Sequence, residues 1–103
     1  MAAGWLVGVL MEVPGEPEPV RRYFAVARSD RAEAEWAAVD AATSLGRVAS
    51  SPRGGVEPVE TEGELPAGFL GRNGLRAGAL RDLGALRPRR WLDAVVRPRS
   101  SID

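Results

Sequence analysis

The sequence contains no cysteine, no histidine and no lysine, and each absence removes a class of chemistry. Without cysteine there is no disulfide, no thiolate nucleophile and no cysteine zinc site. Without histidine the chain lacks the usual acid–base group of neutral pH and the commonest metal ligand. Without lysine it lacks Schiff-base chemistry and the phosphate-binding lysine of a P-loop. This inventory favours binding over catalysis, and we predict no catalytic residue, metal site or cofactor.

All fourteen basic residues are therefore arginine. Together with the many alanines, glycines and prolines, this composition is typical of a bacterial genome rich in G and C. No segment predicts export or membrane insertion: residues 4–11 are apolar, but no basic region precedes them and Glu12 and Pro14 follow directly. We expect a soluble, cytoplasmic protein that does not bind membranes.

The length and composition fit one small domain. The chain has 103 residues, of which 45% are hydrophobic. A domain of this size buries roughly 60–70% of the surface that its unfolded chain exposes, so a core forms without metal or disulfide. We expect a single domain over residues 1–99 and a frayed tail at 100–103.

The first half of the chain predicts a hairpin followed by a helix. Residues 4–13 and 20–28 alternate at the period of a strand, and the first of these is apolar on both faces, as in a central strand. Three prolines within residues 14–19 interrupt the ladder, and this short connection favours antiparallel pairing.

The helix is predicted at residues 30–45, where Asp30 and Glu33 have the spacing of a capping box. Gly46 follows at the place of a left-handed C-cap glycine. The predicted inward stripe has four members: Ala32, Trp36, Val39 and Thr43. Trp36 is the expected anchor on the sheet, so Trp36→Ala would cost about 3–5 kcal/mol.

The second half carries weaker signals, which predict short elements: a strand at 47–50, a turn at 51–55, an edge strand at 56–61, a glycine-rich loop at 65–78 and helical turns at 75–83. Residues 88–97 are either a helix that begins at Pro88 or a final strand. The predicted fold class is α+β: a small two-layer domain in β-β-α-β order, with one main helix on an antiparallel sheet. Short C-terminal helical elements then cover an edge or the other face.

The charge is unevenly placed although the net charge is zero. Residues 1–70 carry eleven acids and six arginines, and residues 71–103 carry eight arginines and three acids. Such asymmetry is typical of a chain that meets a charged partner, or of two halves that attract each other.

Two arginine-bearing segments are candidate contacts for an anion or a nucleic acid. Residues 68–78 are rich in glycine and carry Arg72 and Arg76, so their amides and guanidinium groups can bind an anion. The alternative is a compact connection with left-handed turns. The C-terminal segment carries a second cluster: Arg87, Arg89, Arg90, Arg97 and Arg99, with Trp91 among them. Arginine binds phosphates and tryptophan stacks on bases, but a core position for Trp91 is the alternative.

An acidic run is the third candidate, and it comprises Glu57, Glu60, Glu62 and Glu64. Carboxylates bind hard cations, but no EF-hand spacing is present, so a solvated acidic loop is the preferred interpretation. Our first functional hypothesis is a non-enzymatic module that recognises another protein or a second copy of itself. Nucleic-acid binding through the C-terminal arginines, and small-ligand or anion binding at residues 68–78, are the alternatives.

Overall fold

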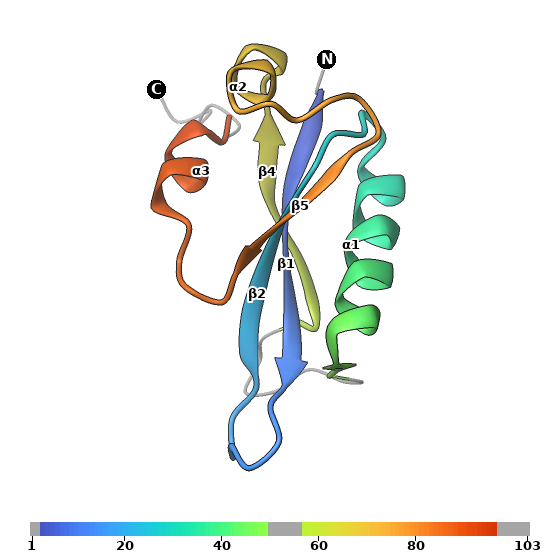
Figure 1. Cartoon of the computed structure of the whole chain (residues 1–103), viewed down its shortest axis with the longest axis vertical. Coiled ribbons are helices and arrows are strands. Elements are labelled where there is room, and N and C mark those ends of the chain that lie inside the picture. The colour runs from blue at the N-terminus through green and yellow to red at the C-terminus, as the bar shows by residue number, and fades with distance from the viewer. Residues whose placement is uncertain (1–2, 50–56, 97–103) are drawn as a thin grey trace, which may run out of the picture.

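A five-stranded antiparallel sheet forms the centre of the computed structural model, which describes residues 3–49 and 57–96 (Figure 1). Strand β1 (Gly4–Glu12) pairs on one side with β2 (Val20–Val26). Trp5 lies opposite Val26 and Met11 lies opposite Val20, so the two strands form the predicted hairpin. The proline-bearing loop between them projects beyond the end of the sheet (Figure 1).

The other side of β1 is shared by two strands. Strand β3 (Arg47–Val48) pairs with Met11 and Glu12, and β4 (Val59–Leu65) pairs with the first six residues of β1. The predicted edge strand is confirmed, although it begins after Pro58 and runs on to Leu65. Since β4 pairs with β1 alone, its outer edge has no strand beside it among the described residues.

Residues 65–83 differ from the prediction. Ala67–Arg72 form the short helix α2, and Leu80–Gly84 form strand β5, which pairs with β2. The predicted loop at 65–78 and helical turns at 75–83 are therefore wrong in these parts. Burial of Leu70 stabilises α2 in spite of its glycines. Strand β5 is too short to show a hydrophobic period, and its structure is decided by pairing with the distant strand β2.

Helix α1 (Arg31–Leu45) confirms the predicted main helix but not its predicted orientation. The Asp30 carboxylate accepts the Glu33 backbone N–H at 2.9 Å and caps the helix as expected. The residues buried against the sheet are Ala34, Ala38 and Ala42, whereas Trp36 is 70% exposed. The predicted inward stripe is thus wrong, since the alanine face lets the helix lie closer to the sheet.

Gly46 also departs from the prediction of a left-handed cap. Its φ of 173° is extended backbone, and its N–H donates to the Ala42 carbonyl at 3.0 Å. The chain leaves the helix directly in the extended conformation of β3, so no left-handed turn is required there.

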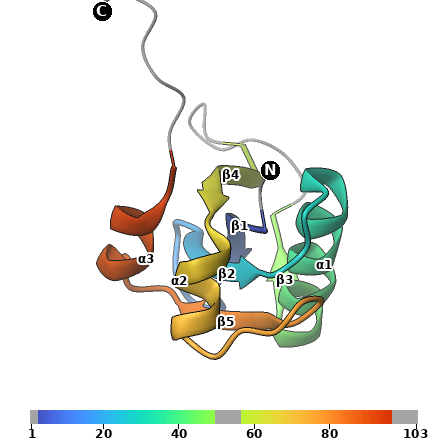
Figure 2. The same cartoon turned by 90° about the horizontal axis from the view of Figure 1, so that it is seen from above.

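Helices cover both faces of the sheet, and α1 and α3 lie on opposite sides of it (Figure 2). Helix α3 (Arg89–Ala94) confirms the helical alternative for the segment after Pro88. Two buried clusters follow from this arrangement. The α1 side comprises Val7, Val9, Met11, Phe24, Val26, Ala34, Ala38 and Ala42. The other side comprises Leu6, Tyr23, Ala25, Ala27, Leu65, Leu70, Leu75, Trp91, Leu92 and Val95.

The structure thus bears out the α+β class, the antiparallel sheet and the single main helix. In residues 3–49 and 57–96, no helix has both the length and the apolar character needed to cross a bilayer. The predicted turn at 51–55 and the predicted tail at 100–103 lie outside the described residues.

Candidate functional site

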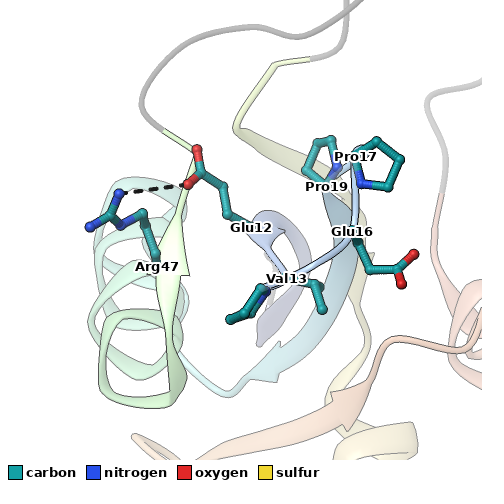
Figure 3. Close-up of a pocket in the computed structure, with 7 residues that line it drawn as sticks. Glu12, Val13, Glu16, Pro17, Pro19 and Arg47 are labelled. Atoms are coloured by element: carbon teal, nitrogen blue, oxygen red, sulfur yellow. Dashed lines mark ion pairs between the residues drawn. The ribbon is translucent and has the colours of Figure 1, made fainter.

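The hairpin loop encloses a hollow of about 470 Å³, shown in Figure 3. Glu12 and Arg47 form its one ion pair, at 3.9 Å, and point toward each other from β1 and β3. Pro17 and Pro19 stand on the opposite wall (Figure 3). Most of the wall is exposed loop, and the Arg47 side chain is 81% exposed, so this hollow offers no buried polar group to bind a ligand.

Two hollows lie between α1 and the outer edge of β4, and we call them together the α1–β4 groove. The lower hollow, of about 380 Å³, is lined by Ala32, Glu35, Trp36, Val39 and Val59. The upper hollow, of about 440 Å³, is lined by Trp5, Arg31, Thr61, Glu62, Gly63, Glu64 and Val96.

The lower hollow is apolar because of the way α1 sits on the sheet. Trp36 lies two residues from both Ala34 and Ala38, and since an α-helix has 3.6 residues per turn, Trp36 points away from the sheet. Ala32 and Val39 flank Trp36 on this outward side and face Val59. The stripe that the sequence predicts to be core therefore forms an exposed wall beside β4.

Several side-chain contacts connect the residues around the upper hollow. Arg31 lies 5.8 Å from the centre of the Trp5 ring, and its Nε donates to Glu35 Oε2 at 3.1 Å. The Thr61 hydroxyl donates to the same oxygen, which ties α1 to β4. Trp5 is held in turn by a hydrogen bond of 2.9 Å from Nε1 to the Ser29 carbonyl.

The acidic side chains of β4 differ in whether they form an ion pair. Arg21 reaches across β1 and its Nη2 lies 3.5 Å from Glu60 Oε1, with the Arg21 side chain only 14% exposed. Among the described residues, neither Glu62 nor Glu64 has an ion-pair partner. Most of the predicted acidic loop is thus an edge strand, and within residues 3–49 and 57–96 two of its carboxylates lie at the upper hollow without an ion-pair partner.

Within the part of the chain that the structure describes, no group of three acidic side chains comes close enough together to hold a metal ion. The shortest ion pair among the described residues lies elsewhere, between Arg22 and Asp82, with Nη2 2.7 Å from Oδ2 and Nε 2.9 Å from Oδ1. The Arg22 guanidinium lowers the pKa of the Asp82 carboxyl through these hydrogen bonds.

The arginines predicted to contact an anion or a nucleic acid are spread over α2, α3 and their connections. Those that lie within the described residues are exposed: Arg72, Arg76, Arg87, Arg89 and Arg90. Trp91 is only 8% exposed, and its ring meets Phe69 edge-to-face with centroids 5.0 Å apart. This placement agrees with the alternative that Trp91 belongs to the core. Nucleic-acid binding stays a prediction.

The glycine-rich segment 68–78 divides into a helix and a tight connection. Its amides are engaged by the protein itself: Gly74 donates to Gly71, Leu75 to Leu70 and Gly78 to Ala27. Gly74 and Gly78 have φ values of 72° and 84°, so both adopt the left-handed turns of the compact alternative. These three amides are therefore already used within the fold, and anion binding at residues 68–78 stays a prediction.

The sequence contains one signal of the α1–β4 groove, the apolar stripe that includes Trp36 and Val39, and assigns it to the core. The pairing of that stripe with Val59 depends on which strand lies beside α1, which no local pattern shows. Comparisons with protein-family models, with curated proteins and with solved structures found no match for the chain.

Proposed function

We propose that this chain is a protein-interaction module whose partner docks in the α1–β4 groove. The observation that supports this proposal most strongly is the exposure of Trp36. Its side chain is 70% exposed and lies beside the lower hollow, which Val39 and Val59 also line. Tryptophan is the residue most enriched at the energetic centres of interfaces, because it buries a large apolar area at small entropic cost. A surface tryptophan at the mouth of an apolar hollow is typical of such a centre.

The free edge of β4 adds a second feature of an interaction surface. Exposed strand edges carry unpaired backbone groups and readily accept another chain. Helix α1 and β4 thus present an aromatic anchor and a hydrogen-bonding edge side by side, as peptide-binding grooves between a helix and an edge strand require.

The partner we propose is another protein and not a second copy of the chain. In the register centred on Glu62, two antiparallel copies of β4 would place Glu62 against Glu62 and Glu60 against Glu64 of the other copy. Like charges directly opposite each other destabilise a strand pair. We place the interaction in the cytoplasm, because a chain without cysteine needs no oxidising compartment.

Site-specific photocrosslinking tests this proposal. A photoreactive amino acid replaces Ala32, which is exposed and lines the lower hollow, in cells of the organism that encodes the chain. The same amino acid at Ala85, which is exposed beyond β5, serves as the control position. We expect a discrete crosslinked protein from position 32 and none of that size from position 85.

A matched pair of substitutions then shows whether the groove makes the contact. Trp36→Ser should abolish the crosslink, and Leu86→Ser, which removes another apolar side chain that is 86% exposed, should leave it intact. Crosslinks that persist after Trp36→Ser, or that appear equally from both positions, would contradict the proposal. Light scattering at several concentrations identifies the remaining case, in which the crosslinked species is a homodimer.

A further inference from the structure

We infer that the α1–β4 groove accepts an extended, basic segment of the partner, which adds to the free edge of β4 as a further strand. This inference rests on the proposed function, because it specifies what occupies the same groove. It follows from three features of the described residues: the direction of the backbone groups of β4, the placement of apolar side chains on one face, and the unpaired carboxylates.

The backbone groups of β4 that are free to bind can be identified from the ladder. Leu10 donates its N–H to the Pro58 carbonyl at 2.8 Å, so residue 58 turns toward β1. Successive residues of an antiparallel strand turn their backbone groups to opposite sides. Pro58 and Glu60 therefore direct their backbone groups toward β1. Val59 and Thr61, which alternate with them, direct their N–H and C=O groups outward.

The upper end of this edge already receives an extended residue. Val96, which follows α3, donates its N–H to the Glu64 carbonyl at 2.9 Å and forms an antiparallel bridge there. The edge is thus able to accept a strand. Among the described residues, no further backbone bond continues from this bridge toward Thr61 and Val59.

The side chains specify an apolar position on the added strand. Residues directly opposite each other in a ladder point to the same face of the sheet. Val59 packs on the α1 side, so the partner residue opposite Val59 points into the lower hollow beside Trp36. A branched aliphatic side chain fits both this apolar environment and the extended backbone.

The charges specify basic positions. Strand β4 carries Glu60, Glu62 and Glu64 and no basic residue. Glu60 already meets Arg21, whereas Glu62 and Glu64 are half-buried at the upper hollow, where Arg31 is the one basic side chain among the described residues. Since Arg31 is engaged by Glu35, an arginine or lysine of the partner can neutralise Glu62 and Glu64.

A designed peptide tests the inference on the full-length chain. The probe is a short, capped peptide with valine opposite Val59 and arginine two residues away on the same face, opposite Thr61, where it reaches Glu62 and Glu64. Its matched control carries glutamate in place of arginine. We expect binding of the arginine peptide, seen as NMR shifts of the Trp36 indole N–H and of the Val59 and Thr61 amides. We also expect slower hydrogen exchange at Thr61, and affinity for the glutamate peptide at least tenfold weaker.

Variants of the chain separate the contributions. Trp36→Ser should weaken binding of the arginine peptide by about tenfold, as expected when an anchor is removed, and Leu86→Ser should not change it. Glu62→Gln combined with Glu64→Gln should reduce both the affinity and its salt dependence. Thr61→Pro removes the outward N–H, so this variant should lose binding of the arginine peptide.

An N-methylated arginine peptide provides the same test without altering the protein, because it lacks the donors that the edge needs. Equal binding of the methylated and unmethylated peptides, or of the arginine and glutamate peptides, would overturn the inference. A Thr61 amide already protected in the free chain would also overturn it, since the edge would then be filled by another segment or a second copy. If the crosslink at position 32 forms and the arginine peptide fails to compete with it, strand addition is wrong and the proposed function stands.

Discussion

Ala38 and Trp36 lie two residues apart on α1 and face opposite environments: Ala38 is fully buried against the sheet, and Trp36 is 70% exposed. A helix with alanine on its inner face approaches a sheet more closely than one with a large side chain there. The close approach excludes Trp36 from the core and places it beside β4. This relationship links the packing of the fold to the surface that we propose as the binding site.

A substitution at the small residue Ala38 should therefore reduce stability more than a substitution at the large residue Trp36. Trp36→Ala should change the free energy of unfolding by no more than about 0.5 kcal/mol, as for other exposed positions. Ala38→Leu should reduce it by about 1–3 kcal/mol, because the larger side chain has no space beneath the helix. Urea denaturation measures both, and a large loss for Trp36→Ala with none for Ala38→Leu would contradict the packing described.

Gly63 on β4 should not tolerate a side chain. Its φ is 156°, and a Cβ there would lie 2.2 Å from Cγ1 of Val95, which is buried after α3. Gly63→Ala should therefore cost about 2–4 kcal/mol, from backbone strain and from displacement of Val95. The midpoint of urea denaturation reports this loss.

Gly15 provides the control for backbone strain alone. Its φ is 84°, and nothing lies within 4 Å of a Cβ built there. Gly15→Ala should cost only about 1–2 kcal/mol, the penalty of a left-handed alanine. If the two glycine variants lose the same stability, contact with Val95 contributes nothing and the account of Gly63 is incorrect.

The Arg22–Asp82 pair should make the free energy of unfolding depend on pH in the acid range. Because Arg22 lowers the pKa of Asp82 below its ordinary value of 3.8, folding is favoured by ionised Asp82 above that pH. This contribution to the free energy of unfolding is lost as the pH falls below 3.8 and through the lowered pKa of Asp82 in the folded chain. With both side chains about one-third exposed, we expect roughly 0.5–1 kcal/mol.

Denaturation of the unmodified chain and of Asp82→Asn, at about pH 6 and about pH 3, checks this dependence. The difference in stability between the two proteins should be present at the higher pH and shrink at the lower. Glu18→Gln, which alters an exposed carboxyl in the hairpin loop, is the control and should show no such difference. A constant effect of Asp82→Asn across this range would show that the ion pair does not contribute.

Trp91 should behave as a core residue in solution. It is 8% exposed, packs against Phe69, and has the Arg81 guanidinium 5.9 Å from its ring centre. With Trp5 and Trp36 replaced by phenylalanine, the remaining fluorescence should be protected from acrylamide. Trp91→Ala should cost about 3–5 kcal/mol. Free access of the quencher to Trp91 would instead favour a role in stacking on an external group.

The hairpin and the main helix could be predicted because their signals are local. Residues 4–12 have the alternation of a strand and place apolar side chains on both faces of the sheet. Asp30 caps the helix within the first turn. Strand β5 could not be predicted in this way. It depends on pairing with β2, more than fifty residues earlier in the chain, and five residues are too few to distinguish a strand from a helical turn.

The candidate site was predictable only in part, for a physical reason. Tryptophan and valine at helical spacing suggest a buried stripe, while alanines occur all around α1 and carry no directional signal. The orientation of the helix is decided by how closely it can approach β1 and β2, which is a property of the assembled sheet. The groove exists because β4 then lies beside the stripe without covering it.

Hydrogen exchange at the Thr61 amide tests the central claim, that the α1–β4 groove binds an extended segment at the free edge of β4. We predict that the arginine peptide slows exchange at Thr61 at least tenfold and leaves β5, at the other edge of the sheet, unchanged. Unaltered exchange at Thr61 under conditions in which the peptide is bound would contradict the claim.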